Sequence, residues 1–390
     1  MEKHQSKIDQ LIEELCPDGV EFKELGEITK VLRGKRLTVS QLFESEKYPV
    51  YHGGIEPIGT YNLKNRNANT VMIINVGASA GTVGYSFVDF WSSDGCFCIE
   101  HADSLLNRYL YFVLSAKETE LRTKVRHAGI PTLDSKILEK IKIALPPLPI
   151  QQEIVRILDT FTELEAELEA ELEARKKQYN HYLNAFFDIK AVEYKELGKI
   201  GTFTRGKRFV KNDIIDEGVP CIHYGELYTH YGVWANHTKS FLSPEIAKRL
   251  RSAHKGDVIL VAAGETIEDI GNSVAWLGNE DVVIHDACFS FSHKLNPKFV
   301  SYFFKTNYFR DQITRYISSG KISSINAKGL EKAKIPIVDN GTQENIVSIL
   351  DNYETLLNDI SIGLPAELNA RRKQYEYYRN KLLTFKEYAK

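Results

Sequence analysis

The chain has 390 residues, which is enough for two or three domains that each bury their own core. Its hydrophobic fraction of 43% and charged fraction of 26% are those of a globular protein, and no apolar run approaches the ~18 residues that a membrane span requires. The net charge of −2 and the five cysteines exclude a strongly basic binder and a disulfide framework, and with no signal peptide they predict a cytoplasmic protein.

The first predicted strand opens a segment that recurs later in the chain. Residues 20–36 and 192–208 are identical at 11 of 17 positions, including Arg-Gly-Lys-Arg at the end of each. Further matches follow in the same order in the two copies, at 94–97 and 286–289, 138–143 and 330–335, 154–159 and 346–351, and 170–179 and 366–375. Because chance does not produce so many matches in one order, the chain is built from two copies of one module.

A basic loop follows the first predicted strand of each copy. Three cations surround a glycine there: Arg33, Lys35 and Arg36 in the first copy, and Arg205, Lys207 and Arg208 in the second. Such a loop lets the backbone approach phosphates while its cations neutralise them or reach guanine edges. A solvated turn is the alternative interpretation, but recurrence at the same place in both copies favours a DNA contact.

Polar, basic and aromatic residues gather in loops that differ between the copies. They are Asn62, Lys64, Asn65 and Arg66 in the first copy, and Tyr224, Tyr228 and His230 in the second. Asn and Arg side chains pair bidentately with adenine and guanine, so these loops are predicted to contact bases. An Asn-rich loop is also simply rich in turns. Loops that differ are what two readers of different half-sites require.

The rest of each module has a mixed pattern. Residues 70–76 and 258–262 are short, β-branched apolar runs that indicate buried strands. Segments near 107–124 and 297–316 have helical spacing, so each module is predicted to be α+β. The glycines of residues 77–84 lack the lysine of a phosphate-binding loop and precede a strand-like run, which favours a glycine hairpin.

A long helix follows each module. Apolar residues recur every three or four positions through Ile154, Ile157, Phe161, Leu164, Leu168, Leu172, Tyr179, Tyr182 and Phe186. Residues 151–187 would form a rod of roughly 55 Å, and residues 346–378 carry a matching stripe. We expect the two helices to pack as an antiparallel coiled coil, the alternative being that each packs only on its own module. Gly363 and Pro365 place the continuity of the second helix in doubt.

Signatures of catalysis and metal binding are not found in the sequence. There is no Asn-Pro-Pro-aromatic tetrad, and the histidines show no ligand spacing. We therefore expect no catalytic residue, no bound metal and no cofactor in this chain. The alternating glutamates from Glu163 to Glu173 are interpreted as the solvated side of the coiled coil, with a protein partner as the alternative.

Charge is unevenly distributed along the chain. Residues 20–148 hold 16 Lys+Arg against 14 Asp+Glu, residues 191–340 hold 20 against 17, and the remainder holds 14 against 21. The differences of +2, +3 and −7 sum to the net charge of −2. Both modules are thus mildly basic, and the acid lies in the helical segments.

The whole chain resembles the specificity subunit of type I restriction–modification systems. The most typical stretches are 145–159, Leu-Pro-Pro-Leu-Pro-Ile-Gln-Gln-Glu-Ile-Val-Arg-Ile-Leu-Asp, and the Ala-Arg-Lys-Lys-Gln-Tyr of 174–179, repeated with one change at 370–375. The start, residues 11–22, is also typical of that family.

This resemblance implies four segments with pseudo-twofold symmetry. They are target-recognition domain 1 with an N-terminal helix (1–148), a central helix (149–190), target-recognition domain 2 (191–341) and a C-terminal helix (342–390). Each domain would read one half of a split site in double-stranded DNA, with the helices as spacer and docking surface.

The resemblance also implies partners that carry the chemistry. Two methylation subunits would bind S-adenosylmethionine, and two restriction subunits would use ATP with Mg for cleavage, although the sequence leaves open whether a restriction subunit is present. Two alternatives come from other classes. A stand-alone DNA-modifying enzyme would transfer methyl groups as the isolated chain, and a coiled-coil scaffold would show no salt-sensitive DNA binding.

Overall fold

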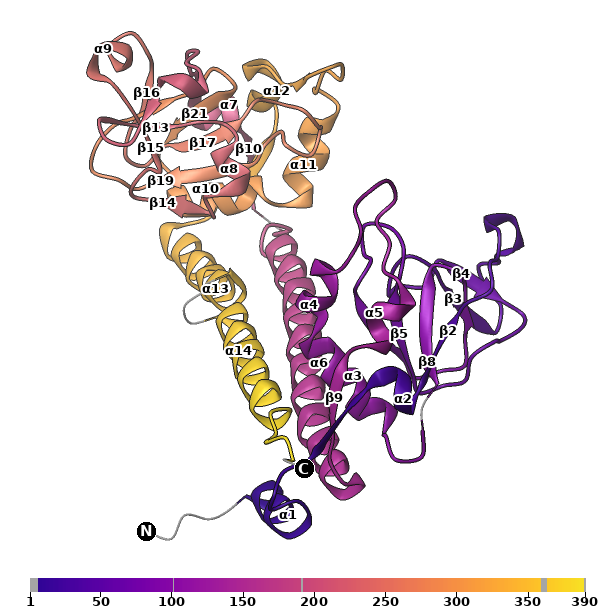
Figure 1. The fold of residues 1–390 in the computed structure, drawn as a ribbon. Coiled ribbons are helices and arrows are strands. Elements are labelled where there is room, and N and C mark those ends of the chain that lie inside the picture. The colour runs from indigo at the N-terminus through magenta and orange to yellow at the C-terminus, as the bar shows by residue number, and fades with distance from the viewer. Residues whose placement is uncertain (1–5, 101, 191, 359–362, 389–390) are drawn as a thin grey trace, which may run out of the picture. The chain divides into compact units, whose positions relative to one another are not determined.

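A computed structural model of the chain describes residues 6–100, 102–190, 192–358 and 363–388. The chain divides into two compact units, Met1–Glu169 with Glu367–Lys390 (unit 1) and Ala170–Ala366 (unit 2). Figure 1 shows the fold, with helices and strands of both units labelled where there is room. Each unit combines one module with part of the long central helix and part of the C-terminal helical region.

The module of unit 1 is built on a four-stranded antiparallel sheet. Its strand order is β2 (Lys30–Arg33), β8 (Cys96–Glu100), β5 (Thr70–Ile74) and β6 (Val83–Ser86). A second sheet has the order β4 (Gly59–Tyr61), β3 (Tyr48–Tyr51) and β7 (Trp91–Ser92), and β1 (Glu21–Glu24) pairs with β9 (Lys142–Leu145). Val71 to Ile74 are fully buried, which confirms the predicted strand at the centre of this core.

Short helices surround these sheets. They are α1 (Lys7–Leu15), α2 (Leu25–Ile28), α3 (Asn107–Ala116), α4 (Glu118–Thr123) and α5 (Ser135–Glu139), with a 3-10 turn at Val39–Gln41. The helix predicted near 107–124 is thus two helices that meet at Lys117. Helix α3 packs on β5 and β6 through its buried face, which includes Tyr109, Leu110 and Val113.

The module of unit 2 has two five-stranded sheets. One has the order β11 (Gly201–Arg205), β21 (Cys288–His293), β17 (Val258–Val261), β19 (Ser273–Trp276) and β14 (Trp234–Ala235). The other has the order β12 (Ile214–Ile215), β15 (Ser240–Leu242), β13 (Val219–Ile222), β20 (Val282–Ile284) and β16 (Ser252–Ala253). Two small ladders complete it, β10 (Tyr194–Glu196) with β23 (Lys334–Pro336) and β18 (Ala263–Gly264) with β22 (Ser323–Ser324).

The helices of this module follow the same plan as those of unit 1. They are α7 (Leu197–Ile200), α8 (Glu226–Thr229), α9 (Pro244–Ala247), α10 (Pro297–Phe304), α11 (Asn307–Thr314) and α12 (Ala327–Glu331), with a 3-10 turn at Lys211–Asp213. The strand order β2-β8-β5-β6 recurs as β11-β21-β17-β19, and the parallel pair β3–β7 recurs as β13–β20. The predicted α+β repeat is therefore confirmed in the fold.

Helix α6 (Leu148–Ala185) is the long central helix, and its first half lies in unit 1. Ile150, Ile154 and Leu158 enter the hydrophobic core of the first module. Further along, Phe161 stacks on Tyr378 of α14 (Leu364–Leu382) with ring centroids 5.5 Å apart, and Glu165 accepts a hydrogen bond of 2.6 Å from Arg372. Residue numbers rise along α6 as they fall along α14, which confirms the antiparallel pairing within this unit.

The second half of α6 packs in unit 2 by the same principle. Leu183 in the last turn of α6 and Phe187 just beyond the helix end enter the core of the second module. Tyr179 and Tyr182 contact the ring of Tyr353 on α13 (Asn340–Asn358), and the Tyr179 hydroxyl donates to Glu354 at 2.7 Å. Each half of α6 thus binds both a module and a C-terminal helix, so the two packing arrangements considered for the sequence coexist.

The C-terminal helical region is described as two helices, α13 and α14. Gly363 and Pro365 lie at the start of α14, where a proline is tolerated because the first helical N–H groups have no intrahelical acceptor. Residues 359–362 lie outside the described part of the chain.

A buried glutamine joins each module to the start of its helix. The Gln151 side-chain oxygen accepts from the Leu106 N–H, and its amide donates to the carbonyls of Ser104 and Pro146. Gln343 does the same in unit 2, accepting from the Asn296 N–H and donating to the Val338 carbonyl. The matching glutamines fix the same junction in both copies, since a buried amide must keep its hydrogen bonds.

Candidate nucleic-acid interface

The basic loop of unit 1 leaves the end of β2 and lies against the turn that precedes β8. The Gly34 N–H donates to the Cys96 carbonyl at 3.2 Å, and the Lys35 N–H donates to the Ser92 carbonyl at 2.9 Å. A Cβ atom at Gly34 would lie 2.0 Å from the Ser93 carbonyl oxygen. Glycine is therefore required for this close approach.

The basic loop of unit 2 repeats this geometry. The Gly206 N–H donates to the Cys288 carbonyl at 3.0 Å, and the Lys207 N–H donates to the Ile284 carbonyl at 3.3 Å. A Cβ atom at Gly206 would lie 2.2 Å from the His285 carbonyl oxygen. The Arg-Gly-Lys-Arg pattern thus encodes one backbone conformation that presents its cations in the same way twice.

In each module an arginine from another loop donates a hydrogen bond to the backbone carbonyl of the first residue of the basic loop. In unit 1, Arg66 Nη2 donates to the Arg33 carbonyl at 3.0 Å. In unit 2, Arg251 Nη1 donates to the Arg205 carbonyl at 2.9 Å. The two arginines occupy equivalent places although their loops have unrelated sequences. Arg251 was missed by sequence reasoning.

Three of the six loop cations donate hydrogen bonds to backbone carbonyls. Arg205 Nε donates to the Asp286 carbonyl at 2.8 Å, and Arg33 Nε lies 3.4 Å from the equivalent Asp94 carbonyl. Lys207 Nζ donates to the Arg249 carbonyl at 3.0 Å. The side chains of all six predicted cations remain exposed, so each loop presents a cationic edge to solvent: Arg33, Lys35, Arg36, Arg205, Lys207 and Arg208.

The remaining candidates of unit 1 lie beside this loop. Asn65 exchanges two hydrogen bonds with the backbone of Ser92, at 2.9 and 2.7 Å, so its amide is already used bidentately. Lys64 Nζ pairs with Asp89 at 2.7 Å and holds the pKa of that carboxyl below its usual value. Asn62 is exposed, whereas Arg66 is half-buried and donates to the Asn65 carbonyl at 2.7 Å.

One of the three candidates of unit 2, Tyr224, lines a groove of about 770 Å³ beside the basic loop of that unit. The Tyr224 ring lies beside two histidines, with its centroid 5.2 Å from that of His285 and 4.5 Å from that of His223. Tyr228 and His230 are exposed on and just after α8. The groove is otherwise lined by residues that include Arg205, Arg208, Phe209, Lys211, Lys321 and Ile322.

Two half-buried histidines, His223 and His285, line this groove. Burial lowers the pKa of both His223 and His285 below the ordinary value. Their Nδ1 atoms face backbone N–H groups, that of Gly225 at 3.4 Å and that of Ala287 at 3.1 Å. The groove therefore combines aromatic rings with cations, and the carboxylates of Glu265 and Asp286 also line it.

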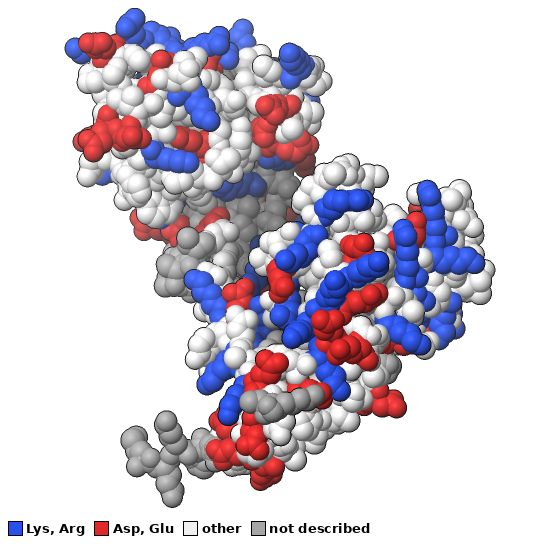
Figure 2. Space-filling model, viewed as in Figure 1, with Lys and Arg blue, Asp and Glu red and all other residues white. Residues whose placement is uncertain are grey.

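The charges can be followed on the surface. Figure 2 shows Lys and Arg gathered over the outer part of the first module, where β3 and β4 lie in Figure 1, with Asp and Glu between them.

Among the described residues, none of the helices has the length and apolar character needed to span a membrane. The same residues contain no group of three or more His, Cys, Asp or Glu side chains that could hold a metal ion.

Comparison with known proteins gives a family match on each module. The model of the type I restriction modification DNA specificity domain matches residues 17–174 and again residues 189–370. A putative type I restriction enzyme specificity subunit of Haemophilus influenzae is 29% identical over 99% of this chain and 100% of its own length. The EcoR124I/EcoR124II specificity subunit of Escherichia coli is 32% identical over 72% of this chain and 71% of its own.

Solved structures share the fold. The S subunit of a type I restriction–modification system from M. genitalium has a TM-score of 0.57 at 17% identity, covering 94% of this chain and 96% of its own. A chain solved to study assembly and conformational transition of the type I R-M system has a TM-score of 0.63 at 15% identity, covering 95% and 98%. The chain thus contains two DNA specificity domains and a long central helix, which is the organisation of a specificity subunit. The chain belongs to the family of type I restriction–modification specificity subunits.

Proposed function

We propose that each module of this chain reads one half of a bipartite site in double-stranded DNA. The observation that carries the proposal is the basic loop, which has the same sequence, the same backbone hydrogen bonds and the same exposed cations in both modules. Two equivalent cationic edges on one chain suit a duplex that presents phosphates at both half-sites. The family, a DNA specificity domain present twice, supports this assignment.

The loop residues take different roles in this proposal. Lys35, Arg36, Lys207 and Arg208 contact phosphates because they extend from the loops with exposed side chains. Arg66 and Asn65 hold the first loop in shape, since their donors already meet backbone carbonyls. The polar and aromatic base contacts come from side chains that differ between the modules: the exposed Asn62 and Lys64 in the first, and the exposed Tyr228 and His230 with the half-buried Tyr224 in the second.

The chemistry of the complex belongs to partner subunits in this proposal. The relatives are named as specificity subunits, and a solved relative was studied for the assembly of its complex. Two methylation subunits would supply S-adenosylmethionine, and two restriction subunits would supply ATP with Mg. The long helices would act as a spacer between the modules and as a docking surface for the partners. The docking role is supported by Glu163 and Glu167 on α6, which are exposed and make no hydrogen bond or ion pair within the described part of the chain.

The salt dependence of DNA binding tests the role of the basic loops. Two triple variants replace the cations of one loop each with alanine: Arg33, Lys35 and Arg36, or Arg205, Lys207 and Arg208. Each should weaken binding of the full chain, in complex with its methylation subunits, and flatten the plot of log affinity against log salt by about one unit per lost phosphate contact. Replacing Lys176 and Lys177 on α6 with alanine serves as the control and should leave the slope unchanged.

Distinct outcomes contradict the proposal. An unchanged slope in both triple variants would reduce the loops to solvated turns. Wild-type protein with no salt-sensitive DNA binding would favour a coiled-coil scaffold, and methyl transfer by the isolated chain would favour a stand-alone enzyme.

A further inference from the structure

Each module carries a second loop whose geometry is the same in both modules, a short hairpin that precedes the last small helix of the module. In unit 1, the N–H and carbonyl groups of Arg126 and Thr132 exchange hydrogen bonds of 2.9 and 3.1 Å. In unit 2, Ser318 and Ser324 exchange hydrogen bonds of 2.8 and 3.0 Å. The two hairpins, 126–132 and 318–324, thus close at the same point and span the same number of residues.

Both hairpins are anchored to the end of the central strand of their module. The Leu133 N–H donates to the Asn75 carbonyl just after β5, and the Ile325 N–H donates to the Ala262 carbonyl just after β17, both at 2.9 Å. These strands are the most deeply buried parts of each core. A rigid base therefore positions each hairpin tip, although the loop sequences are unrelated.

The tip of each hairpin presents an isoleucine to solvent. The Ile130 side chain is 69% exposed and the Ile322 side chain is 62% exposed, each two residues before the closing residue of its hairpin. Single exposed apolar residues are common on protein surfaces and need no explanation. Here the exposed isoleucine recurs at the same position while Gly129 and Pro131 around it are replaced by Lys321 and Ser323.

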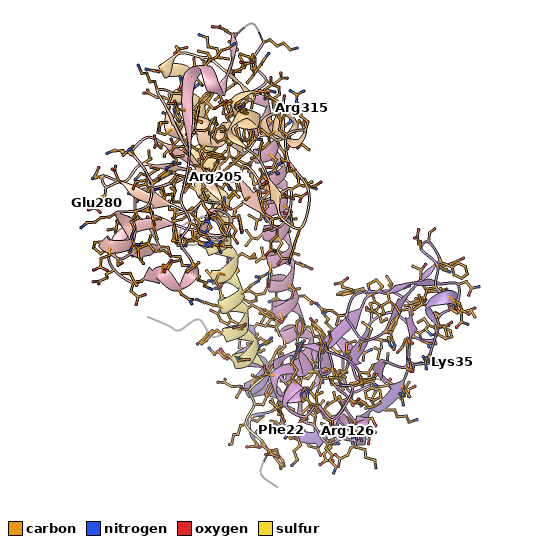
Figure 3. The ribbon with its side chains drawn as sticks, turned by 90° about the horizontal axis from the view of Figure 1, so that it is seen from above. Phe22, Lys35, Arg126, Arg205, Glu280 and Arg315 are labelled. Atoms are coloured by element: carbon orange, nitrogen blue, oxygen red, sulfur yellow. The ribbon has the colours of Figure 1, made fainter. Side chains whose placement is uncertain are left out.

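The hairpins lie beside the basic loops. Ile322 and Lys321 line the same groove as Arg205 and Arg208. In unit 1, Arg126 and Thr132 line a groove of about 520 Å³ together with Arg33. Figure 3 labels Arg126 and Lys35 on the first module and Arg205 on the second. DNA seated on a basic loop would therefore meet the neighbouring hairpin.

We propose that Ile130 and Ile322 are apolar contacts to DNA bases, one for each half-site. This inference rests on the proposed function. Charged loops that neutralise phosphates position a duplex but carry no sequence information, whereas apolar side chains contact thymine methyl groups or enter between base pairs. A branched aliphatic side chain on a rigid tip suits such a contact because it loses little conformational freedom on binding.

The test compares Ile130→Ala and Ile322→Ala in the full chain with its methylation subunits. The probes are a duplex that carries the motif methylated in cells expressing the wild-type complex, and a scrambled duplex of equal length. Each variant should bind the motif about tenfold or more weakly, bind the scrambled duplex as before, and keep the wild-type salt slope because no cation is lost. Ile130→Val should retain most of the affinity.

Leu15→Ala is the matched control, since Leu15 is an exposed apolar residue on α1, 44% accessible. It should leave all three measurements unchanged. Unchanged motif affinity in both isoleucine variants, or an equal loss on both duplexes, would overturn the inference while the proposed function stands. Wild-type complex with no preference for the motif would overturn the proposed function as well.

Discussion

At the scale of residues, one backbone arrangement is supported by two different arginines. Arg66 lies 33 residues after the Arg33 carbonyl that it contacts, whereas Arg251 lies 46 residues after Arg205. The basic loops could be found from the sequence because their four residues repeat. Their supporting arginines could not be paired, because the loops that carry them differ in length and composition. Only the fold brings equivalent side chains to one place.

The structure also separates side chains that are free to contact DNA from side chains that already bond to the protein itself. Asn65 has the chemistry of an adenine reader, but its amide is occupied by the Ser92 backbone. Lys64 is exposed yet paired with Asp89. Sequence gives the donor and acceptor capacity of a side chain and leaves its partner undetermined. For this reason the sequence identified the loops of the interface but not which of their side chains are free to contact DNA.

His293 predicts how the stability of unit 2 depends on pH. Burial lowers its pKa from 6.5 to about 4, so the unfolded chain binds more protons than the folded chain between these values. Stability should therefore fall as the pH drops through this window, and the histidine should contribute a loss of about 3 kcal/mol by pH 4. Urea unfolding at pH 7, 6, 5 and 4 should show a weaker decline for His293→Gln than for the wild type.

An exposed histidine provides the control for this measurement. His254 pairs with Asp281 at 2.7 Å, which raises its pKa, so its contribution is present at low pH and lost as the pH rises. His254→Gln should change the pH dependence in the opposite direction. A decline in His293→Gln equal to that of the wild type would mean that His293 does not titrate in this window.

At the scale of elements, helical periodicity predicted the long helix and its antiparallel pairing with the C-terminal helical region, but not which of its residues would pack on a module. The stripe predicted on α6 includes Ile154, which is buried in the first module, and Phe161, which packs on α14. A repeat of three and four residues shows that a face is covered without showing what covers it. Leu158 belongs to the same core although it was not among the residues predicted for the stripe; it lies four residues after Ile154, on the same face of the helix.

The acidic part of α6 offers a way to test the helix as a spacer. Residues 163–174 are three tandem copies of Glu-Leu-Glu-Ala, and unit 1 ends within them at Glu169. Inserting a fourth copy after Glu169 lengthens a helix by ~6 Å and rotates it by only about 40°. We expect both half-sites to be kept and the unread gap between them to grow by one or two base pairs, since a turn of DNA spans about 34 Å.

Sequencing the methylated motif in cells that express the complex measures this gap directly. Insertion of the four residues elsewhere, after Asn279 in the exposed turn between β19 and β20, is the control and should leave the gap unchanged. Methylation of the original motif with its original gap would mean that α6 does not set the spacing.

At the scale of the whole chain, the organisation follows from the repeat. Two modules with the same strand order each bind one half of α6 and one C-terminal helix. The sequence predicted the copies, their α+β class and the long helices, because each leaves a periodic or repeated pattern. The division into units could not be predicted, since it depends on contacts between residues such as Phe161 and Tyr378, more than 200 positions apart.

Exchange of one module tests the central claim most directly. Residues 20–145 are replaced by the equivalent segment of a relative with a different target, the helices are kept, and the methylated motif is sequenced in cells that express the complex. If each module reads its own half-site, one half of the motif should change to that of the relative while the other half and the gap stay the same. A change in both halves, or in neither, would contradict the account.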